Sequence, residues 1–103
     1  MTSQELKNDK QTFISNVDKF IEEYQEALSK VKSLDSTFSN CEDTILKNEM
    51  LSNNKVLAAN ITNIINNVLS EKASIVARID EEIKRLQEQE YELLKKKESV
   101  EKE

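Results

Sequence analysis

The sequence predicts an all-α protein: a long antiparallel helical hairpin of the coiled-coil type, packing into a multi-helix bundle with partner helices. Its 103 residues include no glycine and no proline, the residues that most often supply tight turns or interrupt helices. Apolar residues recur at alternating steps of three and four, the repeat that keeps one helix face against a partner. Charged residues make up 34% and aromatic residues 5%, so a single compact core is not expected.

The first helix is expected over about residues 3–51. Thr2 and Glu5 have the spacing of a capping box, Thr-x-x-Glu, which marks a helix start. An apolar seam follows, in which only one member is polar: Leu6, Lys10, Phe13, Val17, Phe20, Tyr24, Ala27, Val31, Leu34, Phe38, Cys41 and Ile45. A row at seven-residue spacing widens the apolar face beyond a two-stranded seam: Ile14, Ile21 and Leu28.

Residues 35–43 are the ambiguous part of this helix. The stretch is rich in Ser, Asp and Asn, which favour caps and turns, and Ser39 with Glu42 forms another possible capping box. Against a break, Phe38 and Cys41 keep the helical phase of the seam. We expect a continuous helix here, with a kink or a short turn as the alternative.

The turn is expected at residues 52–55, because the seam positions after Ile45 are polar and Asn tolerates the left-handed backbone region. A second helix is then expected over about 56–100, and the whole chain, 1–103, forms a single helical domain. One of its seven-residue rows is nearly all apolar: Ala58, Ile65, Lys72, Ile79, Leu86, Leu93 and Val100. After Leu86 the apolar stripe narrows among Lys and Glu, so this end can bury little.

The composition argues against an enzyme. There is no histidine and no glycine-rich loop, which removes the commonest general base, the usual metal ligand and the phosphate cradle. We therefore expect no catalytic residue, no cofactor and no metal. The lone Cys41 lies on the seam, so we interpret it as a small buried hydrophobe rather than a nucleophile.

Charge and cysteine usage narrow the partners and the compartment. The net charge is −5 and neither half is basic, so nucleic-acid binding is not expected. No stretch approaches 18 uncharged apolar residues, so we expect no transmembrane segment and at most indirect membrane contact. One cysteine and no export signal suit the cytoplasm or nucleus.

Both helices carry apolar stripes wider than one seam, so we expect partner helices to cover the hairpin. If the hairpin alone left six or more of the side chains that widen these stripes in water, it would forgo about 10 kcal/mol, comparable with a small domain's whole stability. The residues expected at this partner interface are Phe13, Ile14, Val17, Phe20, Ile21, Tyr24, Leu28, Val31, Leu34, Phe38, Ile61, Ile64, Ile65, Val68, Leu69, Ile75, Val76, Ile79, Ile83 and Leu86.

These features favour a non-catalytic coiled-coil subunit that assembles with other helical subunits in a multi-protein complex. A scaffold or tether, as in kinetochore, spindle or vesicle-trafficking machinery, is typical of this style. The seam mixes aromatic with small residues, such as Phe20 with Ala27, which favours a hetero-oligomer over a homodimer. The alternative is a self-associating adaptor or chaperone-like hairpin that binds client helices. A membrane-fusion coil is disfavoured because the seam loses phase near Asn48.

Overall fold

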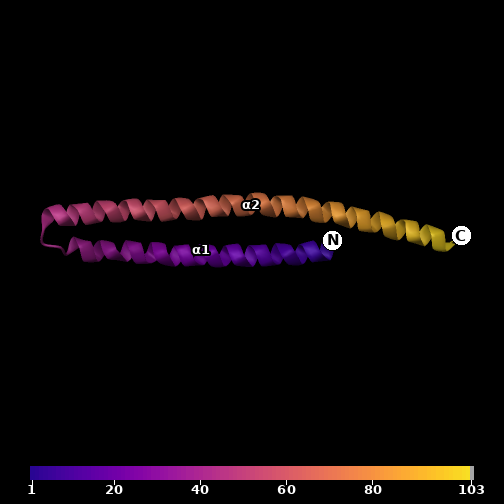
Figure 1. Ribbon diagram of the computed structural model, residues 1–103, viewed down its shortest axis with the longest axis horizontal. Coiled ribbons are helices and arrows are strands. Elements are labelled where there is room, and N and C mark those ends of the chain that lie inside the picture. The colour runs from indigo at the N-terminus through magenta and orange to yellow at the C-terminus, as the bar shows by residue number, and fades with distance from the viewer. Residues whose placement is uncertain (103) are drawn as a thin grey trace. The chain divides into compact units, whose positions relative to one another are not determined.

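The computed structural model describes residues 1–102, with side chains through residue 100, as two helices joined by a short turn (Figure 1). Helix α1 spans Ser3–Ser39 and helix α2 spans Thr44–Lys102. No strand occurs among these residues, and the all-α helical hairpin expected from the seam is confirmed. Two compact units pair stretches of the two helices: a turn unit, Asn16–Glu71, and a terminal unit, Met1–Ser15 with the chain from Lys72 on.

The start of α1 has the capping box that the sequence predicts. Thr2 Oγ1 accepts a hydrogen bond from the backbone N–H of Glu5 at 3.1 Å. The Glu5 carboxylate in turn accepts one from the backbone N–H of Thr2 at 3.3 Å. Each side chain thus satisfies a backbone donor that a helix end leaves without an intrahelical partner.

The turn lies at residues 40–43, not at 52–55, and α1 does not continue to residue 51. The expected continuous helix is wrong, and the alternative of a short turn within 35–43 is right. After Ser39 the backbone closes with two short-range bonds, from Asn40 N to the Thr37 carbonyl at 3.3 Å and from Cys41 N to the Phe38 carbonyl at 3.1 Å. No described residue has a positive φ, so the turn forms without needing glycine.

Asp43 starts α2, where the sequence pattern had suggested Ser39. Its Oδ1 accepts a hydrogen bond from the backbone N–H of Leu46 at 3.0 Å, which is N-cap geometry. The Ser39 hydroxyl instead donates to the Asp35 carbonyl at 2.6 Å, a bond within the last turn of α1. The turn therefore sits where an acidic cap meets the first residues of a new helix.

The Asn pair expected to form a turn lies inside α2 because one of its members is an interhelical contact. Asn54 is 6% exposed. Its Nδ2 donates to the Val31 carbonyl and to Asp35 Oδ1, each at 2.7 Å. The loss of apolar phase after Ile45 thus reflects a new seam with polar members. The buried and half-buried positions of this seam step by four and three: Lys47, Leu51, Asn54, Ala58, Ile61, Ile65 and Val68.

The core of the turn unit is small and lies between the two helices. Ile21 of α1 packs with Ile61 and Ile65 of α2, and all three are buried. Partly buried side chains surround this cluster: Val17, Phe20, Tyr24, Leu28, Val31 and Val68. Because Ile21 belongs to the widening row and not to the main seam, both rows of α1 contribute to packing against α2.

The terminal unit pairs the first turns of α1 with the second half of α2 in antiparallel fashion. Lys10, the polar member of the α1 seam, binds Asp80 with Nζ 2.6 Å from Oδ1. Ile83 is the buried apolar residue of this unit. Its half-buried apolar residues are Leu6, Phe13, Ile14, Ile75, Val76, Ile79 and Leu86.

Candidate partner interface

Most of the residues expected at a partner interface lie between the chain's own two helices. Ile21, Ile61, Ile65 and Ile83 are buried. Leu34, Ile64 and Leu69 are exposed. The others are half-buried: Phe13, Ile14, Val17, Phe20, Tyr24, Leu28, Val31, Phe38, Val68, Ile75, Val76, Ile79 and Leu86. Their apolar area is thus largely used inside the hairpin, and a partner can reach only what remains.

The expectation that the hairpin alone leaves six or more of its widening side chains in water is wrong. Of the residues that widen the two stripes, only Ile64 and Leu69 are exposed. The other members of these rows are buried or half-buried between the paired helices. The hairpin therefore shields most of its own flanks, and the argument from lost burial energy no longer requires a partner there.

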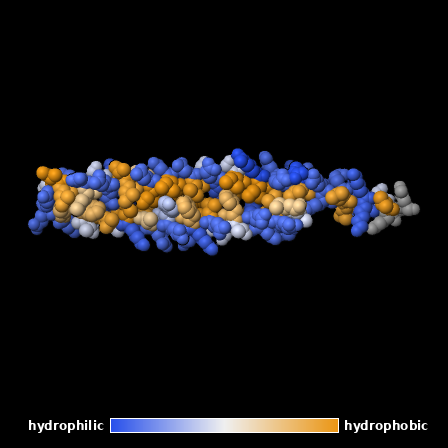
Figure 2. Space-filling view, viewed as in Figure 1, coloured by the Kyte–Doolittle hydropathy of each residue, from blue (hydrophilic) through white to orange (hydrophobic). Residues whose placement is uncertain are grey.

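Apolar surface does remain beside the turn. A groove of about 340 Å³ is lined by four apolar and two amide side chains: Leu34, Phe38, Met50, Asn53, Asn54 and Leu57. Ile45, expected as the last seam member, is 82% exposed in the first turn of α2. Over the paired stretches of α1 and α2, Figure 2 shows apolar atoms in a band between polar margins.

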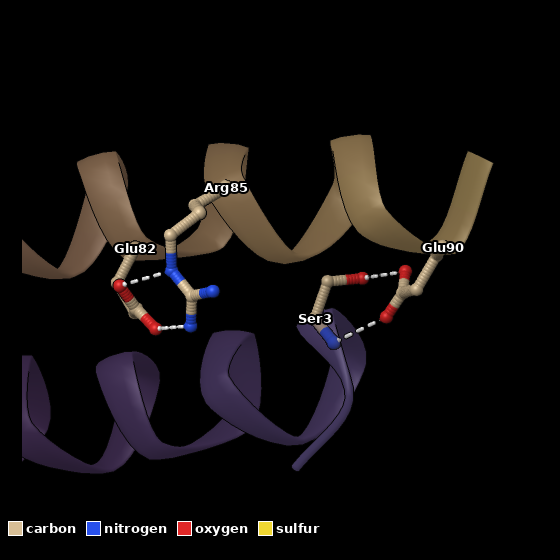
Figure 3. A network of polar contacts seen from close by, with 4 residues as sticks. All are labelled: Ser3, Glu82, Arg85 and Glu90. Atoms are coloured by element: carbon tan, nitrogen blue, oxygen red, sulfur yellow. Dashed lines mark hydrogen bonds and ion pairs between the residues drawn. The ribbon is translucent and has the colours of Figure 1, made fainter. Parts of the chain in front are cut away.

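Ser3, at the start of α1, is hydrogen-bonded to Glu90 of α2. The Glu90 carboxylate accepts the backbone N–H of Ser3 and the Ser3 hydroxyl, each at 2.7 Å (Figure 3). The first backbone N–H groups of a helix have no intrahelical acceptor and favour an anion. The Ser3 N–H, and next the hydroxyl, hold the pKa of Glu90 below its ordinary value.

A second carboxylate in Figure 3 has a partner on its own helix. Glu82 binds the guanidinium of Arg85, one turn further along α2, through both oxygens. The hydrogen bond from Arg85 lowers the pKa of Glu82, and the same bond raises the pKa of Arg85. Glu82 and Arg85 thus pair within α2, whereas Glu90 with Ser3 and Asp80 with Lys10 link α2 to α1 in this unit.

Beyond Glu90, α2 exposes a group of apolar side chains. They are between 57 and 73% exposed: Tyr91, Leu93, Leu94 and Val100. A shallow hollow of about 420 Å³ lies on the same part of α2, and it is lined by Arg85, Glu88, Gln89, Glu92, Leu93 and Lys96. Acidic and basic side chains therefore surround the exposed Leu93.

The turn cysteine and the possible metal ligands can also be compared with the expectations from the sequence. No group of three or more metal-binding side chains occurs among these residues. Cys41 is half-buried in the turn, with Sγ 3.8 Å from the Asp43 carbonyl oxygen, rather than buried on a helical seam as expected. Among the described helices, none combines the length and apolar character needed to cross a membrane.

The interhelical polar contacts are the features that sequence reasoning missed. Asn54 had a signal, because it falls on a step of the α2 seam once the helix is extended backwards to residue 44. The pairing of Ser3 with Glu90 had no such signal, since both residues have the pattern of ordinary surface positions.

Comparisons of the chain with protein-family models, with curated proteins and with solved structures gave no match.

Proposed function

We propose that this protein is a non-catalytic coiled-coil subunit that assembles with other helical subunits into a multi-protein complex. The observation that carries the proposal is the apolar surface of α2 after Glu90. There Tyr91, Leu93, Leu94 and Val100 are exposed on a helix that continues to Lys102. Exposed apolar groups gathered on one element are typical of a surface that binds another protein.

The geometry favours a helix as the partner. Leu86, Leu93 and Val100 form a row at seven-residue spacing, of which Leu86 is half-buried and the other two are exposed. Ser3, the first residue of α1, binds Glu90, and the two exposed members of the row follow that contact along α2. A partner helix that took this place would gain about 1.5–3 kcal/mol for each fully buried Leu or Val.

The charges around this row favour an unlike subunit. The hollow beside Leu93 is lined by two acidic residues, Glu88 and Glu92, and by two basic ones, Arg85 and Lys96. A partner helix that carries both signs in the complementary order would match it, and such pairs set partner choice in coiled coils. We propose that the assembly acts as a scaffold or tether of the kinetochore, spindle or vesicle-trafficking type. We propose the cytoplasm or nucleus as its compartment, because a lone cysteine suits a reducing environment.

The test is purification of the tagged chain from its own cells after lysine cross-linking, followed by mass spectrometry. We expect Lys95, Lys96 and Lys97 to cross-link to helical segments of other proteins. The same purification with Leu93→Asp should lose those proteins, whereas the exposed neighbour Ser99→Asp should keep them. Retention of the same partners at the same yield by Leu93→Asp would refute the proposal.

Folding of the variants separates loss of binding from loss of structure. Leu93 is exposed, so Leu93→Asp should leave the circular dichroism spectrum and melting temperature of the purified chain close to the unsubstituted values. Lost partners together with an unchanged melt place the binding surface on this end of α2.

A further inference from the structure

The exposed side of α2 carries little charge between Ser52 and Ser70. From Ser52 to Ser70 the only charged residue is Lys55, in a chain that is 34% charged. The exposed positions in this stretch are otherwise Asn, Ser, Thr, Ala and aliphatic residues. Solvent-facing sides of helices normally carry charge, whereas the cores of protein interfaces are depleted in it. This side of α2 thus has the composition of an interface core.

A second coiled-coil seam lies on that side. Steps of four and three connect aliphatic residues with Asn: Leu46, Met50, Asn53, Leu57, Asn60, Ile64 and Asn67. Met50 is half-buried and the others are exposed, with Leu46, Leu57 and Ile64 at 38 to 47%. None of these residues belongs to the row that packs on α1, which contains Ile61 and Ile65. The repeat of 3.5 residues is that of a helix with a partner along its whole face.

We propose that this second seam binds a second copy of the chain, with the two α2 helices parallel and in register. In a parallel pair, each seam residue faces the same residue of the other copy, so Asn53, Asn60 and Asn67 each face themselves. An amide carries both donors and an acceptor and is therefore complementary to another amide. The layers between them bring Leu57 onto Leu57 and Ile64 onto Ile64.

An antiparallel pair and a shifted parallel pair match the side chains of the second seam less well. An antiparallel pair sets each Asn against Leu57, Ile64 or Met50, because unlike seam positions then share a layer, and an amide buried against an aliphatic group loses its partners. A slip of seven residues sets Leu46 against Asn53. Only the parallel, in-register pair matches every Asn with Asn and every aliphatic residue with an aliphatic one from Leu46 to Asn67.

Charge also selects this surface for a second copy. The chain carries a net charge of −5, and identical faces that bear charge bring like charges together, which is unfavourable at close range. The second seam contains no charged residue from Leu46 to Asn67. Two copies therefore meet there without opposing their charges.

This pairing does not rest on the proposed assembly with unlike subunits, since it uses other residues. The second seam lies at residues 46–67, whereas the surface proposed for unlike subunits lies after Glu90. A complex that contains two copies of this chain accommodates both.

The mass of the purified full chain in solution tests the pairing. Light scattering or sedimentation over a dilution series should give twice the mass of one chain at high concentration. Asn60→Lys puts like charges on the two-fold axis of the pair and should give the mass of one chain. Asn66→Lys introduces the same charge at an exposed position outside the second seam and should still give the doubled mass. A single-chain mass for the unsubstituted protein, or an equal effect of the two substitutions, would overturn the proposal.

Disulfide trapping tests the register. In a Cys41→Ser background, Asn53→Cys and Asn67→Cys should each form a covalent dimer with itself under mild oxidation. When the two variants are mixed, the parallel pair gives few disulfides between positions 53 and 67, because those residues lie about 20 Å apart along a helix that rises 1.5 Å per residue. A dominant mixed product would overturn the parallel register. Circular dichroism of each variant confirms that the hairpin is intact, and loss of dimer leaves the cross-linking test of Leu93→Asp unaffected.

Discussion

The Glu90 carboxylate binds the backbone N–H and the hydroxyl of Ser3, each at 2.7 Å, at the point where α1 begins. Because these bonds hold the pKa of Glu90 below 4.5, its ordinary value, the folded state prefers the ionised carboxylate. Their contribution to stability is therefore complete above pH 4.5 and is lost as the pH falls through the lowered pKa. Thermal melts at falling pH should show Glu90→Gln losing less stability in this range than the unsubstituted chain.

The control for this pH prediction is Glu88→Gln, which removes the same charge from an exposed position nearby. It should keep the acid sensitivity of the unsubstituted chain. If Glu90→Gln and Glu88→Gln have the same pH profile, the contact between Ser3 and Glu90 does not contribute to the acid sensitivity.

Asn54 should contribute to stability in proportion to its two bonds to α1. Asn54→Ala removes the donors to the Val31 carbonyl and to Asp35, at a cost of about 1–3 kcal/mol for hydrogen bonds in a part-buried site. Asn63→Ala is the matched control, because Asn63 is exposed and the substitution brings the same gain in helix propensity. Urea titrations followed by circular dichroism should show that the free energy of unfolding of Asn54→Ala is lower than that of Asn63→Ala by about 1–3 kcal/mol.

The turn depends on Asp43. Its Oδ1 accepts the Leu46 N–H, and loss of an N-cap costs typically about 1 kcal/mol. Asp43→Ala should therefore lower the midpoint of urea unfolding, and Asp43→Asn should restore most of it, because Asn also caps helices well. Glu42→Ala is the neighbouring control. Equal midpoints for the two Ala variants would mean that the cap does not stabilise the turn.

The helical periodicity predicted both helices, the capping box at Thr2 and the closure of the α1 seam on α2. It misplaced the turn because Phe38 and Cys41 happen to keep the phase of a helix that ends at Ser39. The local signal was present, since Asp43 stands two residues before the apolar pair Ile45 and Leu46 of a new helix. Continuity of an apolar row is weaker evidence than a cap, because a row can align across a break by chance.

The width of the apolar stripes could not identify a partner surface from the sequence. Ile21 lies in the widening row of α1, yet it is a core residue of the turn unit. Leu93 lies in an ordinary seven-residue row, yet it is exposed. Which apolar residues stay exposed depends on how the two helices pair, and hence on the turn.

Truncation of a buried aliphatic residue of α2 should destabilise the hairpin far more than truncation of an exposed one. Ile61 packs against Ile21 and Ile65, so Ile61→Ala removes buried methyl groups and leaves a cavity, which typically costs about 2–5 kcal/mol. Leu69→Ala shortens an exposed side chain and should cost much less, since surface substitutions usually stay within about 0.5 kcal/mol. Urea unfolding should show the first variant with a much lower midpoint and the second close to the unsubstituted chain. Similar losses for the two would mean that the hairpin has no localised core at Ile61.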